Sequence, residues 1–538
     1  MNQEIKHNRD IKTILLGLDG GDLAIFDLLI GLGMMPNLNT FMAEGCRGPL
    51  ISTIPPITSP AWTTMTTGLN PGKHGIFSFH RHLDQDLRRI PVNSSDVSQK
   101  RIWDYFSQQG KRVCVINVPI TYPPSPVNGL MVSGMLTPSS DENFTFPKSL
   151  KTELITECGA YQIDTPWHQY NKGKELIAAL RANLANRRKA IEYLMAKESF
   201  DFSMIVISST DRLQHAFYER ILQIGERGRT SSLLDEEICQ FYRDLDDFLG
   251  HLQRLYKNSH QIFIASDHGF RPVHTKVNIN RWLAQHDRLH YKSAFHGGWL
   301  RFFLRRLDLL GLERLLRKAL PKSRHGRTVA QTHIDWKRTR AYSGAAGDQA
   351  IYLNVAGRDP QGVVMPGDDY DKELAAVKEI IQSLFDHSHG EYILDAIYRK
   401  EDIYQGKYLD TAPDLVLQCR PGYVITDKRS EAKLLNPAGK QTGWHSPEGM
   451  FAASGPGIKK GPRLSPLKLA DILPTLLYSR NLPLLKTFDG ESKKELFSPT
   501  FQDVHQVRWQ EQSTERSTEK AYVDEDIIRQ RLKSLGYL

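Results

Sequence analysis

Cysteine is scarce in this chain of 538 residues, which contains only five. The number is odd, the spacings are wide, and no Cys-X-X-Cys pair occurs. This pattern argues against both a disulfide framework and a zinc site built from thiolates. The five residues are Cys46, Cys114, Cys158, Cys239 and Cys419.

Long apolar runs are also missing. No stretch of about 20 residues is apolar and free of charge, as a membrane-spanning helix requires. The N-terminal segment MNQEIKHNRDIKTILLGLDGGD has a short apolar run broken by Gly and Asp, unlike a secretory signal. We therefore expect a soluble, cytoplasmic protein.

The excess of positive charge is modest. Lys and Arg number 70 against 61 Asp and Glu, a formal net charge of +9. This balance fits an anionic ligand or surface, but it does not indicate specific nucleic-acid binding. With 40% hydrophobic and 24% charged residues, the composition is that of a globular protein long enough for a large core.

Four short apolar runs end in polar turns, and each has the apolar character of a strand buried on both faces. They are TILLGLDGGD (13–22), RVCVINVP (112–119), FSMIVISSTD (202–211) and IFIASDHGF (262–270). Helical patterns at 178–197 and 232–256 separate such runs. The alternation predicts an α/β fold, with a mostly parallel central sheet sandwiched by helices and ligands bound at the carboxyl ends of the strands.

A basic segment interrupts this pattern. We expect a first part of the core at 1–286, a helical insertion or cap at 287–335, a second part of the core at 336–500, and a polar linker with a docked C-terminal helix at 501–538. Residues 301–327 hold nine basic and two acidic residues. This segment fits a solvated cap helix, a contact with an anionic membrane surface, or a helix that binds a partner or a second copy. The sequence does not set the oligomeric state.

Three aspartates and three histidines stand at predicted strand ends or in loops: Asp19, Asp211, His215, Asp267, His268 and His445. Two of them, Asp211 and His215, are four residues apart and share one face if a helix begins after the strand. The neighbours Asp267 and His268 can converge only if their strand has ended, and Gly269 makes that bend possible. We expect His445 in a loop, within QTGWHSPEG.

Each of these six residues alone also fits a turn, a helix cap or a surface position. Together they offer nitrogen and oxygen ligands for two divalent ions, most suitably zinc, with manganese or iron possible. Two close metal ions suit hydrolytic phosphoryl chemistry.

A series of motifs, in order over nearly the whole chain, resembles the alkaline phosphatase superfamily, most closely its type I phosphodiesterase/nucleotide pyrophosphatase branch. The motifs are LGLDGGD, TSPAWTTMTTGLNPGKHGIFSF, INVPITYPP, STDRLQH, SDHGF, APDLVL, GWHSPEGMFAASGPGIKKG and LADILPTLL. The resemblance implies a two-metal hydrolase of small phosphoric esters. It also implies the ligand sets: Asp211, His215 and His445 for one metal, and Asp19, Asp267 and His268 for the other.

The same resemblance implies that Thr58, ten residues before Gly68, is the nucleophile and a metal ligand, and that a phospho-Thr58 intermediate forms. The backbone N–H of Ser59 would bind a phosphoryl oxygen at a helix N-terminus. The other threonines of this stretch are predicted to pack in a helix after Pro60. They are Thr63, Thr64, Thr66 and Thr67.

One position departs from the family pattern. Phosphodiesterases of the branch commonly carry an Asn three residues after the nucleophile, and here that residue is Ala61. A phosphodiesterase or nucleotide pyrophosphatase is the main prediction. A phosphomonoesterase or a head-group phosphotransferase is the alternative, and a non-catalytic, metal-stabilised binding protein is the second alternative.

Several other side chains could touch a substrate or could equally be structural. Aromatic side chains that could form a substrate pocket, or belong to the core, are Trp62, Tyr122 and Trp167, with His168 beside the last. Polar side chains that could contact phosphate or support the site are Lys73, His74 and His274.

Overall fold

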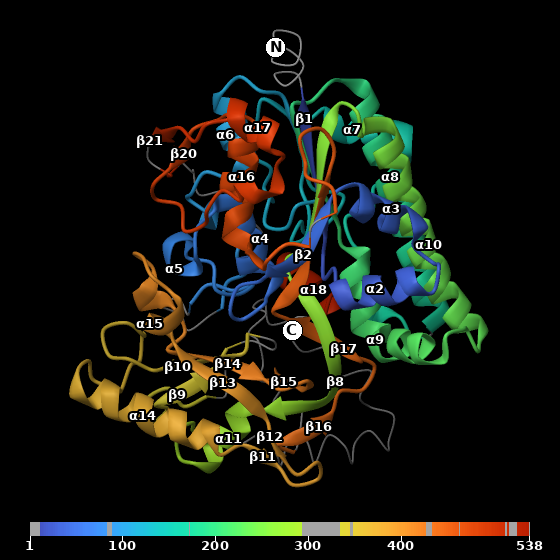
Figure 1. Cartoon of the computed structure of the whole chain (residues 1–538). Coiled ribbons are helices and arrows are strands. Elements are labelled where there is room, and N and C mark those ends of the chain that lie inside the picture. The colour runs from blue at the N-terminus through green and yellow to red at the C-terminus, as the bar shows by residue number, and fades with distance from the viewer. Residues whose placement is uncertain are drawn as a thin grey trace, which may run out of the picture.

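A nine-stranded sheet forms the centre of the molecule (Figure 1). The structure is a computed structural model that describes residues 11–82, 89–171, 173–292, 334–344, 348–426, 433–461, 463–511, 514–515 and 525–536. The strand order is β19-β2-β18-β7-β1-β6-β3-β4-β5. These strands span Leu467–Lys468 (β19), Cys46–Ile51 (β2), Glu448–Ser454 (β18), His260–Ala265 (β7), Lys12–Leu18 (β1), Phe202–Ile207 (β6), Val113–Ile116 (β3), Gly129–Val132 (β4) and Thr145–Phe146 (β5).

Most neighbours in this sheet are parallel. The pairs β7–β1, β1–β6, β6–β3, β3–β4 and β19–β2 run parallel, while β18 is antiparallel to both its neighbours and β5 is antiparallel to β4. All four predicted strands are present, at β1, β3, β6 and β7. The predicted α/β class with a mostly parallel central sheet is confirmed.

Helices cover both faces of the sheet. One face carries α2 (Leu23–Gly31), α3 (Pro36–Glu44), α7 (Leu150–Cys158), α8 (Gly173–Lys197), α9 (Ser209–Arg227) and α10 (Leu233–Tyr256). The other carries α4 (Thr58–Thr67), α6 (Ile102–Gln108), α16 (Ile472–Ser479) and α17 (Pro499–Val504). The short helix α5 (Pro71–His74) follows α4. The helices predicted at 178–197 and 232–256 correspond to α8 and α10.

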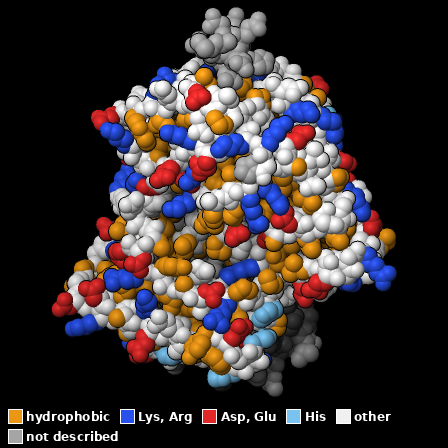
Figure 2. Space-filling model, viewed as in Figure 1, with side chains coloured by type: hydrophobic (Ala, Val, Ile, Leu, Met, Phe, Trp, Pro, Cys, Tyr) orange, Lys and Arg blue, Asp and Glu red, His pale blue; other side chains and the backbone are white. Residues whose placement is uncertain are grey.

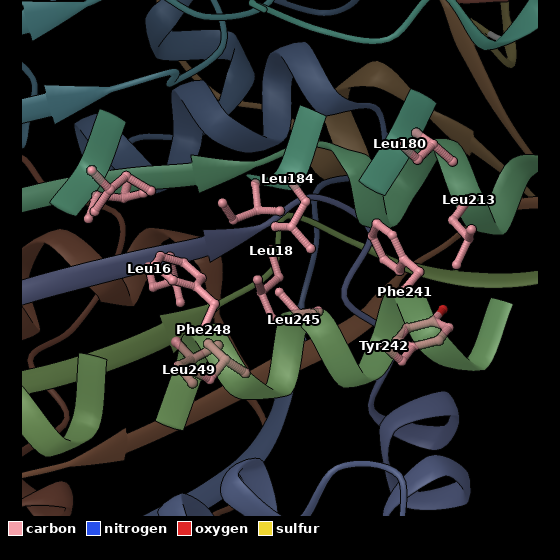
Figure 3. Close-up of a cluster of buried hydrophobic side chains, with 14 of the residues drawn as sticks. Leu16, Leu18, Leu180, Leu184, Leu213, Phe241, Tyr242, Leu245, Phe248 and Leu249 are labelled. Atoms are coloured by element: carbon pink, nitrogen blue, oxygen red, sulfur yellow. The ribbon is translucent and has the colours of Figure 1, made fainter. Parts of the chain in front are cut away.

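The alternation of side chains along β1 divides the core into two layers. Ile14, Leu16 and Leu18 face the layer under α8, α9 and α10, whereas Leu15 faces the layer under α4 and α16. Figure 3 shows Leu16 and Leu18 between side chains of α8 and α10, such as Leu184 and Leu245. Burial of both faces explains why the strand sequences are almost continuously apolar.

Smaller sheets lie beyond the carboxyl ends of the central strands (Figure 1). One contains β9 (Ala341–Ser343), β10 (Ala350–Leu353), β13 (Leu394–Arg399) and β14 (Leu415–Cys419). Another pairs β8 (Gly269–Asn278) with β15 (Gly422–Thr426), β16 (Leu435–Pro437) and β17 (Gly443–Ser446). Helices α11 (Ile279–Gln285) and α14 (Asp368–Gln382) pack with them around a third core. Other short elements are β11 (Phe385–Asp386), β12 (Glu391–Tyr392), α15 (Lys400–Ile403), β20 (Leu484–Leu485) and β21 (Trp509–Gln510).

The C-terminal helix α18 (Glu525–Ser534) is docked, with Ile528 and Leu532 buried. Part of the preceding polar stretch is attached as well, since the N–H of Lys100 donates to the carbonyl of Thr514 and Lys407 pairs with Glu515. Most of the predicted insertion, 293–333, including the basic segment 301–327, lies outside the described residues.

The surface mixes charges of both signs. On the face shown in Figure 2, Lys and Arg side chains alternate with Asp and Glu side chains. Within the described part of the chain, no single helix has the length and hydropathy of a membrane span. Helices α2 and α3 have this length and hydropathy only when they are taken together, and a bend of 113° separates them.

Candidate metal centre

The predicted acidic residues gather at one edge of the central sheet. Asp19 follows β1, Asp211 lies in the first turn of α9 after β6, and Asp267 lies between β7 and β8. Because β6, β1 and β7 are adjacent parallel strands, their carboxyl ends bring these three carboxylates together. All three side chains are fully buried.

Two glycines allow this convergence. Gly20 has a φ of +66°, and its N–H donates to Oδ1 of Asp267 at 3.0 Å. A Cβ on Gly269 would lie 1.9 Å from the carbonyl oxygen of Glu448. Gly269 is therefore required for the close approach of two backbones, rather than for a left-handed bend.

The structure corrects the expected position of His445. This residue lies on the strand β17 and not in a loop, opposite Phe270 in an antiparallel pairing with β8. The pairing with β8, which begins directly after His268, brings His445 to the metal centre. The imidazole rings of His268 and His445 stack with centroids 3.6 Å apart.

Five of the six side chains form two candidate metal sites that share the carboxylate of Asp211. Asp211, His215 and His445 form the first, and Asp19, Asp211 and His268 the second, with the ligand atoms of each within 4.8 Å of one another. Oδ1 of Asp211 lies 3.4 Å from Nε2 of His215 and 3.3 Å from Nε2 of His445.

The second site differs from the predicted set in one respect, because Asp211 takes the place expected for Asp267. Asp267 nevertheless remains adjacent, since its Oδ2 lies 3.2 Å from Nε2 of His268. Oδ1 of Asp19 lies 3.8 Å from the same nitrogen.

The three imidazoles are oriented by backbone carbonyl groups. Nδ1 of His215 donates to the carbonyl of Gly443 at 3.0 Å. Nδ1 of His268 donates to the carbonyl of Gly269 at 3.1 Å. Nδ1 of His445 donates to the carbonyl of Pro56 at 2.8 Å. Each ring therefore presents the lone pair of Nε2 to the centre, as metal-binding histidines do.

Unpaired carboxylate oxygens show that these residues suit a divalent cation. Both oxygens of Asp19, Oδ1 of Asp211 and Oδ2 of Asp267 are buried without a hydrogen-bond partner. Buried carboxylates without partners are costly unless a cation or a proton neutralises them. The set of nitrogen and oxygen donors fits zinc, manganese or iron.

The pKa values of the protein alone reflect this crowding of charge. Burial, followed by the nearby carboxylates, raises the pKa of Asp19 well above its ordinary value. Burial also raises the pKa of Asp267. Burial lowers the pKa of His215 to about 3 and that of His268 well below its ordinary value. For Asp211, burial acts in the opposite direction, but His215 and Arg212 outweigh it, and its pKa is lowered.

Thr58 is the first residue of α4, which therefore begins two residues before Pro60 and not after it as predicted. The helix has no side-chain N-cap, and Pro60 at its third position lacks an N–H. The first turn therefore presents the N–H groups of Thr58 and Ser59, where an anion would be favoured. The hydroxyl of Thr58 is fully buried and lies 3.4 Å from Nε2 of His268.

The other hydroxyls of α4 bond within the scaffold. Those of Thr63, Thr66 and Thr67 donate to carbonyls one turn earlier, at 2.7 to 2.8 Å. The hydroxyl of Thr64 accepts from Nε2 of His74 at 3.0 Å. Among these threonines, Thr58 alone contacts a residue of the metal centre.

The position that departs from the family pattern, Ala61, lies in the core with Trp62. The ring of Trp62 packs so closely on β1 that a Cβ on Gly17 would lie 2.3 Å from it. Of the two roles that the sequence leaves open for Trp62, a substrate pocket or the core, its side chain takes the core position. Close packing of this ring requires glycine at position 17.

The remaining candidates lie at different distances from the centre. Trp167 stacks on His215, with the ring planes 5° apart. Tyr122 is buried against Ile57, the residue before Thr58, and its hydroxyl contacts Glu142.

Three candidates point elsewhere. Lys73 pairs with Asp489, and the ring of His74 bonds to Thr64 and to the N–H of Ile76. His274 bonds to Thr275 and lies against His389.

Two buried charged residues beside the metal centre, Arg212 and Asp164, were not among the predicted candidates. The guanidinium of Arg212 is fully buried and pairs with Asp211 and with Asp164. Its position next to Asp211 in STDRLQH was a signal, because a buried Arg needs an acidic partner. Nothing in the sequence marks Asp164 as that partner.

The central α/β sheet is mostly parallel, and the clusters of Asp and His at its strand ends offer the donors that a metal-dependent hydrolase uses. The family model described as type I phosphodiesterase/nucleotide pyrophosphatase matches residues 13–448, and the chain belongs to this family. The predicted enzyme class, a metal-dependent hydrolase acting on phosphoric ester bonds, is confirmed at the level of the family. No curated protein matches the sequence.

Solved structures resemble the chain at low sequence identity. Phosphonoacetate hydrolase from Sinorhizobium meliloti 1021 is 15% identical, with a TM-score of 0.54 over 86% of this chain and 94% of its own. Human ectonucleotide pyrophosphatase/phosphodiesterase 5 is also 15% identical, with a TM-score of 0.50 over 90% of this chain and 99% of its own. At such identity the likeness shows the fold.

Proposed function

We propose that this protein hydrolyses phosphoric diesters in two displacements at phosphorus, with Thr58 as the nucleophile. The observation that carries the proposal is the placement of the Thr58 hydroxyl, which is buried at a helix N-terminus and 3.4 Å from Nε2 of His268. The other threonine hydroxyls of α4 bond within the scaffold.

In the first displacement, Oγ1 of Thr58 bonds to phosphorus, and the bond from phosphorus to the leaving oxygen breaks. The proton that the Thr58 hydroxyl loses balances the one that the departing alkoxide takes up. In the second, water attacks phosphorus, the bond between phosphorus and Oγ1 of Thr58 breaks, and Oγ1 takes up the proton that water gives up. Two divalent cations held by Asp19, Asp211, His215, Asp267, His268 and His445, most suitably zinc, would supply Lewis acidity for both steps.

The chain itself contributes orientation and charge. The first turn of α4 presents the N–H of Ser59 to a non-bridging oxygen, in the direction that the helix dipole favours. The carbonyls of Gly269 and Pro56 hold the imidazoles of His268 and His445 in one orientation. Burial removes bulk water from the reacting groups and strengthens their electrostatic interactions.

A phosphomonoesterase or a head-group phosphotransferase is the second candidate function. Ala61 favours it, because a methyl group stands where an Asn side chain could donate to a diester oxygen. A comparison of bis-p-nitrophenyl phosphate with p-nitrophenyl phosphate separates the two candidates. The cytoplasmic location stays a prediction, to be tested by fractionation of cells that produce the protein.

The direct test of the nucleophile is Thr58→Ala, with Thr67→Ala as a matched control on the same helix. We expect Thr58→Ala to lower kcat by about 1,000-fold or more while the metal content stays near two ions per chain. Thr67→Ala removes a hydroxyl that bonds only to the carbonyl of Thr63, and activity should persist. Full activity of Thr58→Ala would overturn the assignment.

A further inference from the structure

The C-terminal helix α18 lies beyond residues 13–448, the part of the chain that the family model matches. Figure 1 places it (red) near the junction of the central sheet and the smaller sheets, not at the periphery. Its apolar side chains, Ile528 and Leu532, with the following Leu535, are buried in one cluster with Ile57 and Tyr122. Since Ile57 directly precedes Thr58, this cluster supports the start of α4.

One connection runs from the end of α18 to His215. Nε1 of Trp167 donates to the carbonyl of Leu535 at 2.8 Å. The indole ring lies parallel to the imidazole of His215, with centroids 5.4 Å apart and planes 5° apart. A Cβ on Gly536 would lie 2.2 Å from His168, so the chain end is pressed against this segment. The end of α18 thus holds the indole ring of Trp167 against His215, a predicted metal ligand.

A second connection runs to Asp211. Nη2 of Arg531 donates to the carbonyl of Asp164 at 3.1 Å. Nη2 of Arg212 donates to Oδ2 of Asp164 at 2.8 Å, and Nη1 of Arg212 donates to Oδ2 of Asp211. The side chains of Asp164, Arg212 and Asp211 are at most 1% exposed. Buried charge pairs of this kind are strongly sensitive to displacement of either partner.

Helix α8 holds the same segment from the other side. Nη2 of Arg187 donates to the carbonyls of Gln162 and Ile163, at 2.9 and 2.8 Å. Nδ2 of Asn183 donates to the carbonyl of Gln162 as well. The stretch that carries Asp164 and Trp167 is therefore fixed between α8, which belongs to the core, and α18.

We propose that helix α18 is a positioning element of the active site. By holding Trp167 and Asp164, it fixes the orientation of His215 and Asp211, and it thereby sets the metal affinity of the Asp211–His215–His445 site. The inference rests on the proposed function for its catalytic meaning, but the connections themselves are independent of which group is the nucleophile.

Zinc affinity, measured by competition with a chromogenic chelator, tests this proposal without any turnover. Ile528→Asp combined with Leu532→Asp places two charges in the buried face of α18 and should release it. We expect this double variant, and Trp167→Ala, to bind one of two zinc ions about 10- to 100-fold more weakly, the range seen when partners of metal ligands are lost. Trp167→Phe keeps a ring against His215, and its affinity should stay close to that of the wild type.

Two matched controls accompany these variants. Lys533→Ala changes an exposed residue of α18, and Trp509→Ala removes an indole that is 59% exposed. Both should bind zinc like the wild type.

Amide hydrogen exchange supplies the reciprocal measurement. If α18 strengthens zinc binding, zinc must slow exchange in residues 525–536 by the same coupling. Normal zinc affinity in the double variant, with fast exchange in 525–536, would overturn the proposal. If the double variant does not fold, normal zinc affinity of Trp167→Ala overturns it instead. Activity of Thr58→Ala is a separate readout, so a failure of the nucleophile assignment is distinguishable from a failure of this proposal.

Discussion

The hydroxyl of Thr58 lies 3.4 Å from Nε2 of His268, although 210 positions of sequence separate the two residues. The contact joins the N-terminus of α4 to the loop between β7 and β8. It places the proposed nucleophile beside a ligand of the candidate metal centre, while the neighbouring hydroxyls bond to carbonyls or to His74. The predictions below follow from this centre and its surroundings.

Replacement of Asp19 by Asn should stabilise the metal-free protein. Burial and nearby carboxylates raise the pKa of Asp19, so its stabilising, protonated form is lost as pH rises through that raised pKa. At pH 7 the unfolded chain holds this carboxyl group ionised, so burying it costs free energy, and Asn should raise the free energy of unfolding by about 1–3 kcal/mol.

The same variant should lose part of its response to zinc. Zinc at 100 times its dissociation constant stabilises a folded protein by about 2.7 kcal/mol per site. Thermal unfolding with a chelator and with zinc measures both effects. A metal-free Asp19→Asn protein that is less stable than the wild type, or that zinc stabilises equally, would contradict the account.

His80 should make the protein sensitive to mild acid. Burial, followed by Arg89 and Arg529, lowers its pKa to about 3. The unfolded chain takes up a proton below about pH 6.5, while the folded chain does not until about pH 3. Stability must therefore fall as pH drops through this window, by about 2 kcal/mol between pH 6.5 and 5.

His80→Gln should flatten this dependence, as seen in urea unfolding at pH 5, 6 and 7 with chelator present. His74 has a pKa lowered to about 3 by burial and Arg101, so His74→Gln should behave similarly. An unchanged slope of stability against pH in both variants would show that neither histidine is buried in its neutral form.

Ala61→Asn tests what decides the substrate class. Position 61 lies one helical turn after Thr58, so an Asn there could donate to a non-bridging oxygen. A hydrogen bond to a charged group contributes about 1.5–3 kcal/mol. We expect kcat/KM for bis-p-nitrophenyl phosphate to rise about tenfold relative to p-nitrophenyl phosphate.

This gain should accompany a loss of about 1–3 kcal/mol in stability, because Ala61 is packed in the core. Ala61→Ser, whose hydroxyl is too short to replace the amide, is the control. A ratio of the two substrates that Ala61→Asn leaves unchanged would show that this position does not set the preference.

Local patterns predicted the strand ends and the acidic residues that follow them. Continuous apolar runs identified β1, β3, β6 and β7, and parallel pairing then required Asp19, Asp211 and Asp267 to meet. The helical spacing of Asp211 and His215 was sufficient to place both on one face of α9.

The features of the site that the sequence did not predict depend on contacts between segments far apart in the chain. His445 lies on a strand because β17 pairs with β8, and its short polar sequence gave no strand signal. The sharing of Asp211 between two sites depends on distances that no spacing encodes. A docked C-terminal helix was predictable from its pattern, but its carbonyl contact with Trp167 was not, since backbone acceptors carry no sequence signature.

The central claim is that Thr58 becomes covalently bonded to phosphorus. Rapid mixing of the zinc-loaded protein with bis-p-nitrophenyl phosphate, followed by acid quenching and mass spectrometry of the peptide that contains Thr58, tests it most directly. The account predicts a phosphoryl ester on Thr58 within the first turnover, absent from Thr58→Ala and present in Thr67→Ala. Turnover without any adduct, together with inversion at a chiral phosphorus centre, would mean direct attack by water and would contradict it.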